Sequence, residues 1–203
     1  MMVSAALRIL EFELKGLAGI GLWVARRRHG VPAGATVLTY AKEQSFMLSL
    51  MTFAMAVETV VVDLLLAGFG VPAWIRYTVL VADLYGLLFS AMLAAACVTR
   101  PHVVTPGELR IRYGVYFDLR VPRDHIAAVR TGRAYNEAGM VTVKDGRLTV
   151  AVASQTNLTI ELTEPITVVR PLGARAEVTS IRCFADAPDQ ALTALRAEPA
   201  AHS

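Results

Sequence analysis

Two long apolar segments with a short turn between them constrain this fold more than any other feature of the sequence. They cover roughly residues 45–67 and 73–98, and each exceeds the length of about 20 residues with which a helix crosses about 30 Å of hydrocarbon. The turn between them, GFGVP at residues 68–72, is tight and uncharged. The sequence therefore predicts a transmembrane helical hairpin over residues 45–99.

The composition is that of a membrane protein. Hydrophobic residues make up 55% of the chain, charged residues make up 18%, and the mean hydropathy is +0.48, whereas soluble domains carry about 25% charged residues. The net charge of +3 does not indicate nucleic-acid binding, because the basic residues are not gathered into one stripe with interleaved aromatic side chains. We therefore expect membrane lipids, and no nucleic acid, among the partners.

Basic residues flank the hairpin on the side away from its turn. Arg26, Arg27, Arg28 and Lys42 precede it, and Arg100 follows it. Because lysine and arginine are enriched in cytoplasmic loops, this asymmetry predicts two spans of the cell inner (plasma) membrane with both termini in the cytoplasm. The N-terminus lacks the pattern of a cleavable signal peptide, so we expect it to be retained.

The first 29 residues have the pattern of an amphipathic helix. Arg8, Glu11 and Lys15 fall on one face, and the apolar stretch ends at Trp23, just before the basic cluster RRRH. These features are typical of a helix that lies in the cytoplasmic membrane interface. The alternative is that this helix packs on the rest of the protein or on a partner.

One acidic and one basic residue lie near the turn of the hairpin. Asp63 precedes Gly70 by seven residues and Arg76 follows it by six. Antiparallel helices that meet at a turn centred near Gly70 bring these two positions to a similar depth, about two turns from the outer surface. The sequence therefore predicts an intramembrane ion pair with a structural role, in which Arg76 reaches towards the headgroups.

Two further acids lie deeper, near the middle of each span. Glu58 precedes Gly70 by twelve residues and Asp83 follows it by thirteen, so both lie at a similar depth. An ionised carboxylate there costs about 2.5–3.5 kcal/mol on insertion scales. Three roles remain open: the acids dock on a partner's helix or a second copy, they are neutral and hydrogen-bond each other, or they relay protons or ions. Docking is favoured because one hairpin is too small to enclose a transport path.

The remainder of the chain is β-rich. Residues 30–44 contain proline and glycine punctuation and are predicted to be a linker. From residue 100 the pattern changes to period two, and Asp145-Gly146 between two alternating runs is a hairpin signal. Six or seven strands and a short terminal helix predict a small β-barrel or sandwich over residues 100–197, followed by a disordered tail at 198–203.

Three segments in this order, VTPGELRIRYG, FDLRVPRDHIAAVR and SIRCFADAPDQALTALR, resemble the PH-like domain of small bacterial integral membrane proteins. The combination with an upstream hairpin is similar to the actinobacterial type, and the segment RPLGARAE inserts a loop that departs from the pattern. The resemblance covers about half of the chain and implies a PH-like fold with a non-catalytic binding or scaffolding role. The expected fold class is thus membrane α+β: an interfacial helix, a transmembrane hairpin and a PH-like β domain.

No catalytic or cofactor signature is present in the sequence. The chain has neither a phosphate-binding glycine loop nor a nucleophile elbow, and its two cysteines are too few for a disulfide framework. The four histidines stand far apart, without further ligands at metal-binding spacing: His29, His102, His125 and His202. We therefore expect no enzyme, no cofactor and no metal site.

These observations predict a non-catalytic accessory or scaffolding subunit of a larger inner-membrane complex, such as a transporter of lipids or other hydrophobic cargo. One alternative is a stand-alone module that senses anionic lipids. The other is a proton-coupled transport element that acts as a homo-oligomer. The residues expected to contact lipid headgroups are Arg26, Arg27, Arg28, Arg120 and Arg123.

Overall fold

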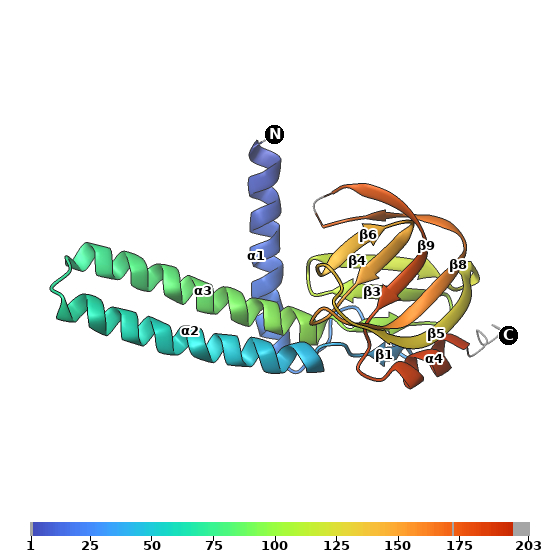
Figure 1. The fold of residues 1–203 in the computed structure, drawn as a ribbon, viewed down its shortest axis with the longest axis horizontal. Helices are drawn as coiled ribbons and strands as arrows, with labels where there is room; N and C mark the ends of the chain where they lie inside the picture. Colours follow the sequence, from blue (N-terminus) through green and yellow to red (C-terminus); the bar gives the residue numbers. More distant parts are fainter. Residues whose placement is uncertain (1, 172, 197–203) are drawn as a thin grey trace.

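The computed structural model describes residues 2–171 and 173–196 and shows a long helical hairpin that projects from a β domain, with a further helix lying crosswise to it (Figure 1). The predicted tail, residues 198–203, lies outside the described residues. The helices are α1 (Met2–Val24), α2 (Lys42–Gly68), α3 (Ala73–Thr99) and α4 (Pro188–Arg196), with a 3₁₀ turn at Arg123–His125. The strands are β1 (Thr36–Leu38), β2 (His102–Val104), β3 (Glu108–Tyr113), β4 (Phe117–Pro122), β5 (Ile126–Ala134), β6 (Val141–Lys144), β7 (Arg147–Val150), β8 (Thr156–Val169) and β9 (Arg175–Cys183).

The hairpin helices α2 and α3 have 27 residues each, which corresponds to about 40 Å at 1.5 Å per residue. Both are long and apolar enough to cross a membrane. Large apolar side chains face outward along them, including Phe46, Phe53 and Trp74 with 75%, 67% and 71% of their surface exposed. In water such a surface would be a large unfavourable apolar patch, so the hairpin has the surface of a membrane-inserted element.

The turn of the hairpin is closed by backbone hydrogen bonds at the end of α2. The Gly70 N–H donates to Ala67 O and the Val71 N–H donates to Leu66 O, the pattern of a Schellman motif. Gly70 takes the left-handed conformation that this motif needs, with φ of +68°. Pro72 then precedes the first turn of α3, where its fixed φ suits the start of a helix.

Helix α1 packs on α3. A Cβ at Gly16 would lie 3.0 Å from Met92 Sδ, and a Cβ at Gly19 would lie 3.6 Å from Ala96 N, so the two helix backbones approach closely at these glycines. Tyr85 donates a hydrogen bond of 2.5 Å to Glu13 Oε1 near the same crossing. The sequence left open whether this helix packs on the rest of the protein, and in the structure it packs on α3.

Two sheets form the β domain. The first is antiparallel in the order β1-β2-β3-β4, and the second has the order β5-β8-β9-β7-β6, in which β7 and β9 run parallel. Apolar side chains from both sheets, such as Ile111, Val121, Ile160 and Ile181, have no exposed surface and form the core. Ala191 and Leu195 bury the apolar face of α4 against this core. The domain has a sandwich-like α+β layout with more strands than the six or seven expected.

The predicted linker is where the sequence interpretation needs correction. Residues 30–44 include strand β1, which pairs antiparallel with β2 in the register Val37↔Val103. Leu38 and Tyr40 are buried, with 3% and 0% of their surface exposed. The alternation in TVLTY is only five residues long. The proline and glycine beside it are signals of a loop, so the sequence pattern does not predict a strand there. Helix α2 also begins earlier than predicted, at Lys42.

Candidate functional site

The charged pair near the hairpin turn is joined directly. Arg76 Nε and Nη2 donate to Asp63 Oδ1 and Oδ2 at 2.5 and 2.8 Å, a bidentate arrangement. Further down the hairpin, the hydroxyl groups of Thr52 and Ser90 lie 2.6 Å apart and form a second polar tie between α2 and α3. The two contacts fix the register of α2 and α3, so we assign them a structural role within the hairpin.

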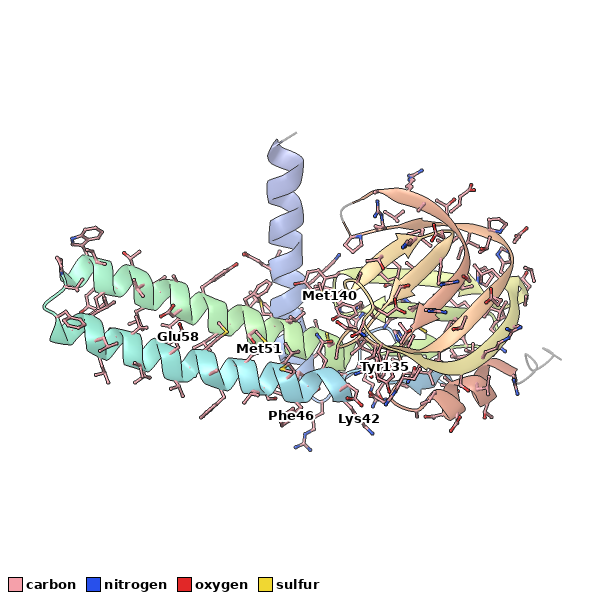
Figure 2. The ribbon with its side chains drawn as sticks, in the orientation of Figure 1. Lys42, Phe46, Met51, Glu58, Tyr135 and Met140 are labelled. Carbon is pink, nitrogen blue, oxygen red and sulfur yellow. The ribbon has the colours of Figure 1, made fainter. Side chains whose placement is uncertain are left out.

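Glu58 and Asp83 lie between these two ties. Met55 and Gly86 face each other one turn away, since a Cβ at Gly86 would lie 3.0 Å from Met55 Cε, so Glu58 and Asp83 are at the same level of the hairpin. Glu58 is exposed and Asp83 is half-buried, and Figure 2 labels Glu58 on the middle turns of α2. Among the side chains that the structure describes, those of residues 13–171 and 173–196, neither carboxylate has a hydrogen-bond or ion-pair partner, and no such bond joins the two.

The other end of the hairpin is fixed to the β domain. The Asp186 N–H donates to Thr39 O at 2.7 Å, and Asp186 Oδ1 accepts the Lys42 N–H at 3.2 Å at the start of α2. Tyr113 on β3 donates its hydroxyl to Gln44 Oε1 at 3.0 Å. These bonds link three separate parts of the chain, so the hairpin and the β domain meet at a defined junction.

A buried arginine holds the segment that follows α1 at this junction. Arg112 has 2% of its surface exposed, and its Nη1 and Nη2 donate to His29 O and Gly30 O at 2.7 and 2.9 Å. The His29 N–H in turn donates to Thr99 O at 2.9 Å, at the end of α3. Burial lowers the pKa of Arg112, although an arginine keeps its charge at any physiological pH.

A cavity of about 770 Å³ lies at the junction, between the end of α1, the start of α2 and the end of α3. We call it the basic cavity; the cations that line it are Arg26, Arg27, Arg28 and Lys42. Asp186 is the one acid in its lining, and Trp23 and Val98 are among its apolar residues. In the part of the chain that the structure describes, none of these four cations forms an ion pair. The cavity is therefore an electropositive site with one apolar wall.

The structure brings together only some of the basic residues that the sequence suggested for lipid contact. Arg120 lies on β4, is exposed, and has Nη1 3.9 Å from Glu108 Oε2. Arg123 donates to Ala194 O and Leu195 O at 3.0 and 2.8 Å, so it satisfies carbonyl groups at the end of α4. Neither residue lines the basic cavity.

Sequence reasoning missed two members of the basic cavity, Lys42 as a lining group and Asp186 as the residue that anchors the start of α2. In the sequence, Lys42 is recognisable only as a charge that flanks the hairpin. Asp186 lies 144 residues away from Lys42, so no local pattern connects them. Among the described residues no cluster of histidine, cysteine, aspartate or glutamate forms a potential metal site.

Comparison of the chain with protein-family models, with curated proteins and with solved structures finds no match. The PH-like character of the β domain stays an expectation from its sequence motifs.

Proposed function

We propose that this protein is a non-catalytic accessory subunit of a larger inner-membrane complex, and that its hairpin docks on a partner's helices through Glu58 and Asp83. The observation that carries the proposal is the contrast between the two charged levels of the hairpin. Asp63 and Arg76 satisfy each other, whereas Glu58 and Asp83 have no partner among the described residues. A hydrogen-bonding or basic group on another chain is the simplest partner for the two carboxyl groups.

The energetics favour docking over a neutral carboxyl pair and over a proton or ion relay. An unpartnered carboxylate near the bilayer centre is unfavourable by about 2.5–3.5 kcal/mol if it stays ionised. A basic or hydrogen-bonding side chain on a partner's helix would remove that penalty. A neutral pair needs a hydrogen bond between the two carboxyl groups, which the described side chains do not form. A relay needs an enclosed polar path, and exposed apolar side chains surround the two acids.

The position of α1 supports the predicted interfacial location of this helix. Its glycines approach α3 at Met92 and Ala96, which lie about 10 and 5 Å from the end of α3 at 1.5 Å per residue. An interfacial helix buries its apolar face about 5–10 Å into the headgroup boundary. We infer that α1 lies in the cytoplasmic interface while it packs on α3.

In this proposal the β domain has a PH-like fold and contacts cytosolic parts of the host complex. The junction bonds at Asp186 and Gln44 hold it at one end of the hairpin. A transporter of lipids or other hydrophobic cargo is the proposed host, by analogy alone. A stand-alone lipid-binding module is the second candidate, and the basic cavity is the observation that favours it.

The proposal is tested by purifying the tagged full-length protein from its native membranes in mild detergent. We expect a membrane-protein partner to co-purify at a fixed stoichiometry. Glu58→Gln together with Asp83→Asn should reduce the partner's recovery at least tenfold. The matched control, Glu177→Gln together with Asp189→Asn, removes two exposed charges from the β domain and should leave recovery unchanged.

Different outcomes would redirect the assignment. Recovery of the protein alone, as a monomer or homo-oligomer, would overturn the subunit function. If the double variant keeps its partner but loses a transport activity of the complex, the two acids act as a relay. If neither assembly nor activity changes, Glu58 and Asp83 have no docking role.

A further inference from the structure

We propose that the basic cavity and an adjoining apolar groove form a binding site for a single anionic phospholipid of the cytoplasmic leaflet. The site is separate from the Glu58 and Asp83 level of the hairpin. It follows from side chains of α1, α2 and α3 that meet beside the β domain, and it uses the predicted orientation of the hairpin.

The charge of the basic cavity fits a phosphate-bearing headgroup. Arg26, Arg27, Arg28 and Lys42 contribute four cations, and the single acid, Asp186, accepts a hydrogen bond from a backbone N–H at the start of α2. The cavity thus keeps an excess of positive charge, with four cations against one acid. Arginine side chains can bind phosphate oxygens through two parallel hydrogen bonds, so a phosphodiester would supply the negative charge that the described side chains lack.

Helix α1 ends at the arginine cluster that lines the cavity. The Arg26 N–H donates to Trp23 O and the Arg27 N–H donates to Leu22 O, which is a Schellman motif. Arg26 occupies its left-handed position with φ of +53°, where glycine is the usual residue. Residues in such uncommon conformations concentrate at functional sites. Arg26 thus keeps a cation in the cavity lining at a position where glycine would be less strained.

The basic cavity continues into the hairpin as an apolar groove of about 430 Å³. Trp23, Ser45 and Val98 line both hollows, so a ligand can occupy the two together. From Ser45 to Ala56 the groove follows α2 for about 16 Å at 1.5 Å per residue. One leaflet contributes about 15 Å to the roughly 30 Å hydrocarbon core, so the length suits one acyl chain.

The small side chains of α3 make this groove. Ala91 and Ala94 line it opposite Leu48 and Phe53 of α2, and the absence of larger side chains on α3 leaves room for a chain. Trp23 stands where the groove meets the basic cavity, as expected for an indole at the membrane interface. The charge of one compartment and the apolar length of the other together specify an amphiphile rather than a soluble anion.

The test measures lipid retention by the full-length protein. Protein purified in detergent and stripped of lipid is offered equal amounts of phosphatidylglycerol and phosphatidylcholine with identical acyl chains, and bound lipid is counted by native mass spectrometry. We expect one phosphatidylglycerol per protein, retained in preference to phosphatidylcholine. Arg27→Gln with Arg28→Gln should weaken that binding about 30-fold, the effect of two basic groups beside an anionic surface.

Matched variants separate charge at the site from overall charge. Arg130→Gln with Arg147→Gln removes two exposed arginines from the β domain and should leave lipid binding unchanged. Arg26→Gly removes a third cavity cation while placing the preferred residue in the left-handed position, so it should weaken binding without lowering the melting temperature. This variant keeps the test informative if the double substitution impairs folding.

Two further arms distinguish a phospholipid from a soluble phosphate. Ala94→Leu should fill the groove and reduce phospholipid retention. Glycerol phosphate, which has no acyl chain, should compete poorly with phosphatidylglycerol for the unsubstituted protein. Equal retention of the two lipids would overturn the charge selection. Strong binding of glycerol phosphate that Ala94→Leu leaves unchanged would replace the lipid site with a soluble-anion site. These readouts are independent of whether a protein partner co-purifies.

Discussion

The ring of Tyr40 stacks on the imidazole of His102 with centroids 4.6 Å apart. Tyr40 follows β1 and His102 begins β2, so the contact joins the segments on either side of the hairpin. Both groups are buried, and the Tyr40 hydroxyl accepts the Gly114 N–H at 2.7 Å. His102 Nδ1 accepts the Arg112 N–H at 3.0 Å, which leaves Nε2 to carry the proton and donate to Phe184 O at 3.0 Å. The imidazole is therefore neutral in the fold.

This geometry predicts an acid-sensitive β domain. Burial lowers the pKa of His102 to about 4 from its ordinary value of 6.5. The unfolded chain therefore binds a proton that the folded chain does not between pH 6.5 and 4, and the free energy of unfolding falls as the pH falls through that window. The loss approaches about 3 kcal/mol near pH 4, at about 1.4 kcal/mol per pKa unit.

Thermal unfolding of the detergent-solubilised protein between pH 7.5 and 4.5 checks this expectation. His29 contributes with the same sign, because burial and neighbouring arginines also lower its pKa. His102→Phe isolates the larger effect: it should lower stability at pH 7.5 and flatten the dependence below pH 6.5. An equally steep pH dependence in that variant would contradict the assignment.

A second prediction concerns the Asp63–Arg76 pair. Asp63→Asn removes a charge that accepts two hydrogen bonds and leaves Arg76 unpaired, so the melting temperature in lipid nanodiscs should fall by several degrees. Exchanging the partners, Asp63→Arg with Arg76→Asp, restores opposite charges and should recover part of the loss. A melting temperature that drops further in the exchanged protein would show that the orientation of the pair, and not its charge, is what matters.

A third prediction concerns the crossing of α1 and α3. Gly16→Leu adds a side chain where Met92 already fills the space, so it should cost about 1–3 kcal/mol of packing and expose α1 to limited proteolysis. Gly21→Leu is the control, since a Cβ there meets nothing within 4 Å. Met92→Ala combined with Gly16→Leu should restore protection, and failure to do so would place the strain elsewhere.

A fourth prediction concerns the junction. Asp186→Ala removes the carboxylate that accepts the Lys42 N–H and should cost about 1 kcal/mol, the usual effect of losing an acceptor at a helix start. Amide hydrogen exchange in the first turn of α2 should rise with it. Asp189→Ala, an exposed neighbour on α4, should leave both quantities unchanged.

Local signals account for what was predicted from the sequence. The hairpin follows from uninterrupted apolar runs, and the turn at Asp145-Gly146 follows from residues that accept positive φ, which is +52° at Asp145. The Asp63–Arg76 contact followed from counting residues on either side of the turn.

What the sequence did not reveal depends on distant segments. Strand β1 is three residues long and is a strand only because it pairs with β2, which follows both hairpin helices in the sequence. The parallel pairing of β7 with β9 leaves no periodic trace that differs from an antiparallel one. The basic cavity combines the end of one helix with the start of a second and the end of a third, and only the folded chain brings them together.

The pairing of β1 with β2 has a consequence for biogenesis. The hairpin is inserted between two neighbouring strands of one sheet, so the sheet forms only when residues 36–38 and 102–104 reach the same side of the membrane. A nascent chain in which only one of α2 and α3 had crossed would leave these strands in different compartments. Completion of the β domain thus requires that α2 and α3 cross the membrane together or not at all, which separates the folded chain from a half-inserted one.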